Sequence, residues 1–165
     1  MEDVTDTDPL SVQAVQPHGG GLALPVLLRI GLGVYGQVIR ARLAAAGFED
    51  LPRNGAFVLG RVAVRGSGGQ LTGELGVSKQ ATSQLLDTMV VRGYLSRQSD
   101  PQDRRRLDIQ MTERGRAAAA VIAAGVQDVD HALAQRVTAA QMDGLRTALT
   151  KLHALQPHDI PELTR

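Results

Sequence analysis

Cysteine is absent from this chain of 165 residues, and aromatic side chains make up only 2 % of it. Without cysteine there can be no disulfide, no cysteine-ligated zinc and no thiol that senses an oxidant. Because tryptophan is also absent, a buried core has to be built mainly from aliphatic side chains and alanine. Alanine loses no side-chain entropy in a helix, so this composition predicts a mostly helical protein.

Signals for export, for a membrane and for catalysis are missing too. The N-terminus lacks a basic segment followed by an apolar run, which a signal peptide would need. No segment has the roughly 20 uninterrupted apolar residues of a membrane span. The histidines are His18, His131, His153 and His158. They lack the spacing of metal ligands, and no catalytic set of side chains stands out. The sequence therefore predicts a cytoplasmic protein that is not an enzyme and needs no metal or cofactor.

Charge is nearly balanced overall, with a net charge of +1, but it is unevenly distributed along the chain. Residues 1–28 contain four acidic residues and neither lysine nor arginine. Residues 97–116 contain six arginines against four acidic residues. A local concentration of positive charge can steer a polyanion, so the second segment is a candidate for binding nucleic acid.

The N-terminal third holds a glycine motif that leaves two interpretations open. Residues 24–46 are apolar, and the second half of this segment is predicted as a helix that ends at Gly47. The motif G-x-G-x-x-G within it consists of Gly31, Gly33 and Gly36. In a dinucleotide-binding enzyme such glycines lie at a strand-to-helix turn, followed by further βαβ units. In the second interpretation the motif is part of a helix, and its small residues allow a neighbouring helix to approach closely.

Residues 53–65 fit neither the helical nor the strand period cleanly, and only their stretch 56–64 could supply a matching strand for a nucleotide site. The next pattern is more specific. A short helix is predicted at 71–76, and Ser78 is suited to cap a second helix over 79–92 that ends at Gly93. Two short helices joined by such a turn indicate a helix-turn-helix.

The second helix of this pair has two different faces. Its expected buried stripe consists of Thr82, Leu85, Leu86 and Met89. The outward side chains near its start are hydroxyl, amide and ammonium groups, which suit phosphates and base edges in a major groove. They are Ser78, Lys79, Gln80, Ser83 and Gln84.

A β-hairpin is predicted next, with strands at 94–98 and 107–112. The loop between them carries three consecutive arginines, Arg104, Arg105 and Arg106. Arginines at such a tip can enter the narrow minor groove, and Arg97 on the first strand is assigned to DNA binding with them. Asp103 is interpreted as the partner that orients a neighbouring arginine.

Four motifs in this region resemble those of the MarR family of bacterial regulators. In chain order they are LGVSKQ at 75–80, GYLSR at 93–97, DPQDRR at 100–105 and MTERG at 111–115. The resemblance implies a homodimer joined through its first and last helices, a recognition helix at 78–92 and a minor-groove arginine at Arg105. It also implies that a small, often phenolic, molecule releases the DNA.

The chain departs from the usual family pattern at four positions. Thr82 stands where valine is usual, which could loosen the packing of the helix. Arg106 replaces a small residue and adds charge at the base of the wing. Val90 and Val91 replace polar residues and are expected to be partly exposed.

Two further helices are predicted after the hairpin. Thr112 is suited to cap one that runs to about Val137, and Thr138 and Gln141 form a capping box for the other. The last helix carries an a/d-type seam made of Met142, Leu145, Leu149 and Leu152. This seam could pack within one chain. Dimerisation is preferred, because two linked half-sites multiply the affinity of a winged helix for DNA.

These observations predict a mostly α protein with a small β-hairpin wing (α+β), a winged helix-turn-helix. The expected parts are a flexible arm at 1–21, a dimerisation helix at 22–52, a DNA-binding domain at 53–112, dimerisation helices at 113–156 and a tail at 157–165. The expected function is a repressor that binds a pseudo-palindromic operator in double-stranded DNA as a homodimer. Its further partner would be a small aromatic or phenolic effector, and no membrane partner is expected. A nucleotide-binding enzyme and a winged helix that contacts only proteins are the alternatives.

Overall fold

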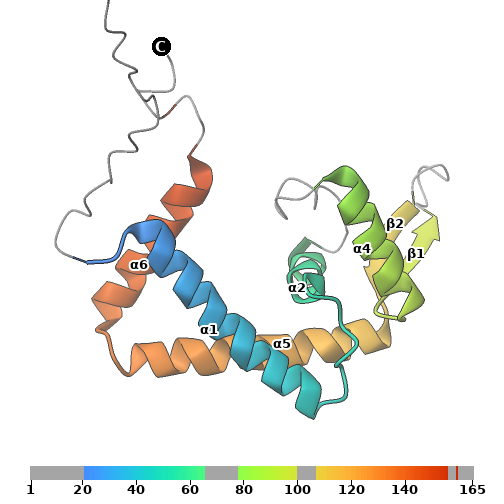
Figure 1. Ribbon diagram of the computed structural model, residues 1–165, viewed down its shortest axis with the longest axis horizontal. Helices are drawn as coiled ribbons and strands as arrows, with labels where there is room; N and C mark the ends of the chain where they lie inside the picture. Colours follow the sequence, from blue (N-terminus) through green and yellow to red (C-terminus); the bar gives the residue numbers. More distant parts are fainter. Residues whose placement is uncertain (1–20, 66–77, 100–106, 156–158, 160–165) are drawn as a thin grey trace, which may run out of the picture. The chain divides into compact units, whose positions relative to one another are not determined.

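The computed structural model describes residues 21–65, 78–99, 107–155 and 159. The described chain is mostly helical with one two-stranded sheet (Figure 1), as predicted. The elements are α1 (Leu24–Ala45), α2 (Gly55–Arg65), α4 (Lys79–Val91), β1 (Leu95–Ser99), β2 (Leu107–Met111), α5 (Glu113–Ala134) and α6 (Ala139–Ala154). The predicted arm, the short helix at 71–76 and the tail beyond 159 lie outside the described residues.

The chain divides into two compact units, residues 1–34 and 35–165, and α1 runs across the boundary. The helix occupies the whole apolar segment, whereas only the second half was predicted as helical. It is followed by Gly47, whose φ of +78° a residue without a side chain adopts at little cost.

The glycine motif lies inside α1, and the residues directly before it, from Leu24 onward, are helical rather than a strand. Its amide groups are therefore those of a helix interior rather than of a strand-to-helix turn, and the geometry of a dinucleotide site is absent from these residues. The nucleotide-binding alternative is wrong for this reason. The other interpretation, close approach of a neighbouring helix at these glycines, stays a prediction.

The ambiguous segment at 53–65 forms a helix, α2, and so supplies no strand. Its side chains at Val58, Leu59 and Val62 are buried because these spacings lie on one face of a helix. They form the core together with Leu43 of α1 and Met89 of α4.

Helix α4 begins at Lys79, as predicted, and ends at Val91, one residue before the predicted end. Ser78 is its N-cap and accepts a hydrogen bond from the amide of Ala81, and Gly93 follows the C-cap with a φ of +73°. Thr82 is buried, but its hydroxyl donates to the main-chain oxygen of Ser78 at 3.2 Å. The threonine therefore leaves no unsatisfied polar group in the core. Val91 is 86 % exposed, more than expected.

The strands β1 and β2 are antiparallel, with Leu95 opposite Met111 and Arg97 opposite Ile109. The first strand lies one residue later at both ends than the predicted 94–98, and the second ends one residue earlier than the predicted 107–112. Leu95 and Ile109 are buried, so one face of the hairpin covers the core.

The C-terminal helices have the predicted caps, Thr112 for α5 and the Thr138–Gln141 capping box for α6. Helix α5 ends at Ala134, three residues earlier than expected. Tyr35 of α1 donates a hydrogen bond to Asp130 of α5, which raises the pKa of Tyr35 to about 12. Asp130 also pairs with Arg146 of α6 at 3.0 Å.

The hairpin and α5 meet at a very close approach. A Cβ added to Gly115 would lie 2.1 Å from the main-chain oxygen of Tyr94. Thr112 completes the junction, because its amide donates to that oxygen at 3.2 Å and its hydroxyl donates to the oxygen of Gly93 at 2.6 Å. Only glycine fits here, which explains the glycine of the MTERG motif in physical terms.

We expect Gly115→Ala to lower the free energy of unfolding by about 1–3 kcal/mol, because the added methyl group forces the backbone of Tyr94 to move. Urea unfolding measures this change. Gly144→Ala is the matched control: its added Cβ meets no atom of the described chain within 4 Å, and alanine in a helix interior stabilises by roughly 0.5–1 kcal/mol. Equal unfolding midpoints for the two variants would contradict the prediction.

Candidate nucleic-acid interface

The exposed face of α4 carries the side chains predicted to contact DNA. All five are exposed: Ser78, Lys79, Gln80, Ser83 and Gln84. Thr82 and Met89 are buried on the other side of the helix, so core packing fixes the outward direction of the polar face. The first turn contains no acidic residue, and the partial positive charge of a helix N-terminus favours phosphate groups. This face can hydrogen-bond to phosphates and base edges.

Arg97 lies on β1 and forms an ion pair with Asp87 of α4. Both side chains are exposed, so the pair contributes little to stability and a phosphate group can compete for the arginine. The structure thus brings one of the predicted DNA-binding arginines next to the recognition helix. Its role in DNA binding stays a prediction.

The remaining predicted residues of the wing lie outside the described residues. They are Asp103, Arg104, Arg105 and Arg106. The described ends of β1 and β2 are paired at Ser99 and Leu107.

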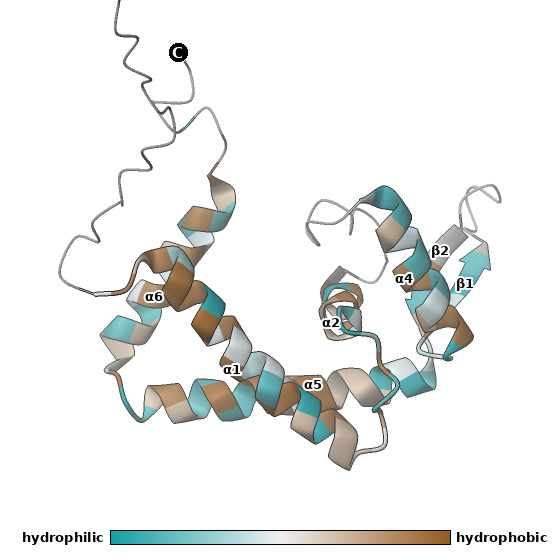
Figure 2. Cartoon of the chain, viewed as in Figure 1, coloured by the Kyte–Doolittle hydropathy of each residue, from teal (hydrophilic) through white to brown (hydrophobic). Residues whose placement is uncertain are grey.

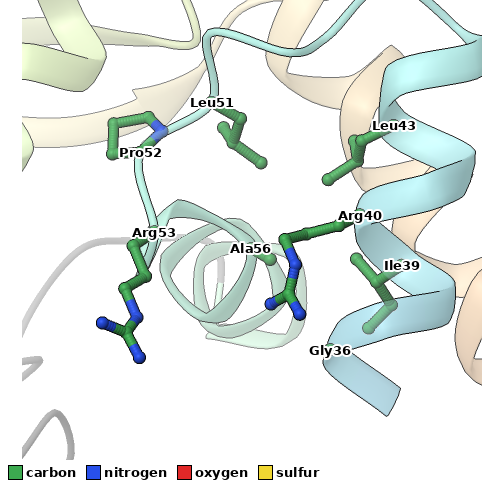
Figure 3. A pocket seen from close by; sticks show the side chains of 8 residues that line it. All are labelled: Gly36, Ile39, Arg40, Leu43, Leu51, Pro52, Arg53 and Ala56. Atoms are coloured by element: carbon green, nitrogen blue, oxygen red, sulfur yellow. The ribbon is translucent and has the colours of Figure 1, made fainter. Parts of the chain in front are cut away.

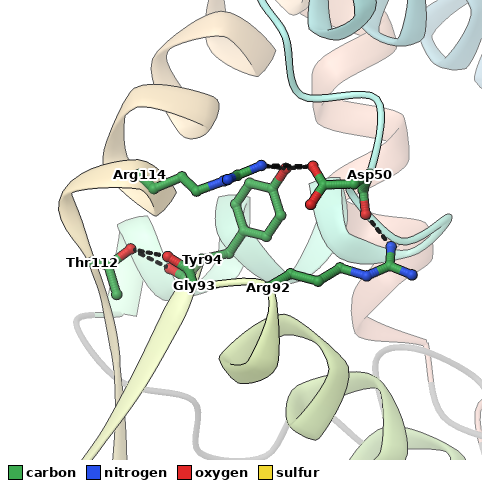
Figure 4. Close-up of polar contacts among 6 residues, drawn as sticks. All are labelled: Asp50, Arg92, Gly93, Tyr94, Thr112 and Arg114. Atoms are coloured by element: carbon green, nitrogen blue, oxygen red, sulfur yellow. Dashed lines mark hydrogen bonds and ion pairs between the residues drawn. The ribbon is translucent and has the colours of Figure 1, made fainter.

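A buried tyrosine forms a polar cluster that the sequence analysis missed (Figure 4). The hydroxyl of Tyr94 donates to Oδ1 of Asp50 at 2.5 Å, and Nη2 of Arg114 donates to the same oxygen at 2.7 Å. The guanidinium of Arg114 also lies over the ring of Tyr94, 4.7 Å from its centre. Arg92, the C-cap of α4, donates to the main-chain oxygen of Asp50. The cluster joins the segment before α2 to the end of α4 and the start of α5.

These contacts shift the ionisation of all three groups. The hydrogen bond from Tyr94 and the charge of Arg114 hold the pKa of Asp50 below its ordinary value. Burial, followed by the hydrogen bond to Asp50, raises the pKa of Tyr94. Contact with Tyr94 and Asp50 raises the pKa of Arg114. Each group is therefore held in its usual charge state at neutral pH.

An open pocket of about 510 Å³ lies between the second half of α1 and the start of α2 (Figure 3). Its lining residues are Gly36, Ile39, Arg40, Leu43, Leu51, Pro52, Arg53 and Ala56. Neither Arg40 nor Arg53 has an ion-pair or hydrogen-bond partner within the described ranges. The pocket therefore combines apolar walls with two cationic groups that no acidic side chain of the described residues pairs with.

Comparison with known proteins shows which family the chain resembles. Residues 50–106 match the sequence model of the MarR family. The apo form of wild-type MarR from E. coli is 22 % identical, covers 80 % of this chain and 97 % of that chain, and has a TM-score of 0.58. The chain is thus similar to the MarR family in sequence over residues 50–106 and in fold over most of its length. The predicted resemblance is confirmed, and so is the winged-helix fold that it implied.

Two further solved structures with a similar fold are relevant to the site. The M. tuberculosis MarR family protein Rv2887, solved in complex with p-aminosalicylic acid, is 26 % identical with a TM-score of 0.55, over 80 % of this chain and 99 % of that chain. S. aureus MepR, solved as a DNA complex, is 17 % identical with a TM-score of 0.64, over 81 % and 98 %. No curated protein matches the sequence.

The family match begins at Asp50 and includes α2, α4 and β1. The MarR-family sequence signal therefore lies in the winged helix, whereas α1, α5 and α6 are related to the family through the fold. Asp50 and Tyr94 fall inside the matched range, but Arg114 falls outside it.

The lowered pKa of Asp50 predicts a pH-dependent contribution to stability. Because the folded-state pKa is below the unfolded one, the contribution is fully present above about pH 4 and is lost as the pH falls through the folded-state value. The stability difference between the parent and Asp50→Asn should therefore be largest near neutral pH and shrink below about pH 4. Urea unfolding at several pH values measures it, with Glu49→Gln as the control for loss of a neighbouring carboxylate. A constant difference from neutral to acidic pH would contradict this account.

Proposed function

We propose that this protein is a MarR-family dimeric repressor that reads a pseudo-palindromic operator in double-stranded DNA and responds to a small aromatic anion. The observation that carries the DNA-binding part is the polar face of α4, which is exposed, free of acid in its first turn and held outward by buried Thr82 and Met89. The predicted cytoplasmic location fits this role, because operator DNA is found there.

In this proposal the start of α4 enters the major groove, where Gln80 and Gln84 read base edges and Ser78, Lys79 and Ser83 bind mainly phosphates. The arginines of the hairpin loop, with Arg105 foremost, would enter the minor groove. Arg97 would leave Asp87 for a phosphate. The DNA complex of MepR supports this mode of binding as the structure of a relative with the same fold.

Dimerisation is supported by apolar residues that one chain leaves exposed. Figure 2 shows the hydropathy of the residues along α1 and α6. On α6, Leu145, Leu149 and Leu152 are 44 %, 36 % and 42 % exposed, while Met142 is half-buried. The alternative that the seam packs within the chain is therefore not favoured. We propose that this seam is part of the surface that meets the second copy.

The N-terminal half of α1 is a second apolar surface. Leu24, Ile30 and Leu32 are each more than half exposed. By length and composition alone α1 could also cross a membrane. We favour a protein interface, because Arg29 interrupts the apolar run and Arg42 pairs with Asp128 of α5.

The proposed effector is an aromatic carboxylate held in the pocket between α1 and α2. Arg40 and Arg53 would bind the carboxylate, and Ile39, Leu43 and Leu51 would contact the ring. A charged hydrogen bond to an otherwise unpaired arginine favours an anion over a neutral molecule of the same shape. The complex of Rv2887 with p-aminosalicylic acid supports this ligand class from a relative.

Gln80→Ala and Gln84→Ala are expected to change which operator sequences are selected, because each lost pair of base contacts removes about 1–3 kcal/mol of discrimination. Selection from a random DNA library measures this, and Gln127→Ala, an exposed change on α5, is the control. Unchanged preferences in both variants would remove base readout from this face. Affinity that does not fall as salt rises would favour the protein-contact alternative, because phosphate binding releases counterions.

Leu149→Glu is expected to convert the protein to a monomer, because a charge would be buried in the apolar seam. Sedimentation equilibrium measures the mass. Thr147→Glu, an exposed change two residues away on α6, lies on the other side of the helix and should leave the dimer intact. A dimer that survives both changes would exclude the α6 seam from the interface.

Benzoate is expected to bind the pocket, and benzamide, its neutral analogue, is expected to bind at least about ten-fold more weakly, because it forms no charged hydrogen bond. Arg40→Gln and Arg53→Gln should remove this preference for the anion. Isothermal titration calorimetry measures both molecules with the parent and with each variant. Equal affinity of the parent for both molecules would contradict the assignment of the two arginines.

A further inference from the structure

The wall of the pocket and the polar cluster at Tyr94 are made by consecutive residues. Leu51, Pro52 and Arg53 line the pocket. Asp50, the residue immediately before them, accepts the hydrogen bonds of Tyr94 and Arg114. A movement of the wall is therefore transmitted by one peptide link to Asp50.

The segment that contains these residues is tightly folded. The amide of Leu51 donates to the oxygen of Phe48 at 3.2 Å, and the amide of Gly55 donates to the oxygen of Pro52 at 2.7 Å. A Cβ added at Gly55 would lie 2.9 Å from the side chain of Leu51. The proline also fixes its own φ. The segment therefore has little conformational freedom with which to absorb a shift of the pocket wall.

Asp50 holds the end of the recognition helix from two sides. Its carboxylate binds the hydroxyl of Tyr94, whose amide in turn donates to the oxygen of Met89 in α4 at 2.9 Å. Its main-chain oxygen binds Arg92, the C-cap of α4. Tyr94 is fully buried, so its side chain has no freedom to follow Asp50 without moving the helix end.

We propose that Asp50 is a positioning residue that sets the placement of the C-terminal end of α4 and through which an anion between Arg40 and Arg53 changes the affinity for DNA. The inference rests on the pocket and the DNA interface of the proposed function. A carboxylate that draws Arg53 toward Arg40 moves the pocket wall, Asp50 moves with it, and the end of α4 follows. The two sites thus share one element whose position both ligands bias.

The first test needs neither DNA nor ligand. Amide hydrogen exchange is measured at Arg92, Gly93 and Tyr94, whose amides bond to α4, in the full-length protein. Asp50→Asn should speed exchange at these amides, and Tyr94→Phe, which keeps the buried ring and removes only the hydroxyl, should do so in part. Glu49→Gln should leave them unchanged. Exchange in Asp50→Asn that equals the parent overturns the positioning role.

The second test measures coupling as the ratio of DNA dissociation constants with and without saturating benzoate. We expect a ratio of about 5 or more in the parent and in Glu49→Gln, within the usual range of allosteric coupling. Asp50→Asn and Tyr94→Phe should still bind benzoate and DNA but give a ratio near 1. A merely structural weakening would change both dissociation constants equally and keep the ratio, and a folded Tyr94→Phe with the parent ratio overturns the route.

Failure of the proposed function has a different signature. A parent protein that binds no DNA, or whose DNA affinity benzoate does not alter, contradicts the DNA interface or the effector pocket and overturns the coupling with it. The exchange measurement then still decides whether Asp50 positions the end of α4. The two failures are therefore distinguishable.

Discussion

The close approach of α5 to the main chain of Tyr94 is the constraint on which the rest of the site depends. The oxygen of Tyr94 accepts the amide of Thr112, and Gly115 leaves the space for it. With its backbone held there, the side chain of Tyr94 projects into the core and its hydroxyl meets Asp50. One residue therefore fixes the base of the hairpin, the end of α4 and the start of α5 relative to one another. The polar face of α4 has a defined direction because this junction leaves its helix little freedom.

The caps and ends of the helices could be predicted from the sequence because their causes are local. Ser78, Thr112 and Thr138 each bond to an amide three residues ahead, and such spacing is visible in a linear pattern. The hydrogen bond between Asp50 and Arg114 joins residues 64 positions apart, and no local pattern predicts it. The sequence held a weak signal for this cluster, since Tyr94 and Arg114 both lie in the motifs that resemble those of the family. The pocket was missed for the same reason, because α1 and α2 form it only when packed together.

The glycine motif shows why a short pattern needs its structural context. In a helix each glycine costs about 1 kcal/mol relative to alanine, so three within six residues disfavour a helix over 31–36 and suggest a turn. The surrounding leucine, isoleucine and valine side chains nevertheless continue through the motif, and the segment is helical from Leu24 to Ala45. Segment 53–65 shows the converse: an unclear period becomes α2 because Val58, Leu59 and Val62 find one core. Tertiary packing decided the second case.

Forming the N-terminal half of α1 as a helix has a free-energy cost that contacts within the single chain do not offset. This cost is the strongest argument for a second copy. This half of α1 carries Gly31 and Gly33, yet Leu24, Ile30 and Leu32 stay more than half exposed. A helical segment with glycines and no burial is marginal in water, because most helix stability in proteins comes from packing an apolar face. Burying each such side chain contributes roughly 1.5–3 kcal/mol, more than the glycines cost. The same consideration applies to Leu145 and Leu152 on α6. Dimerisation is thus proposed as a condition for the stability of these helices, beyond its benefit for binding two half-sites of an operator.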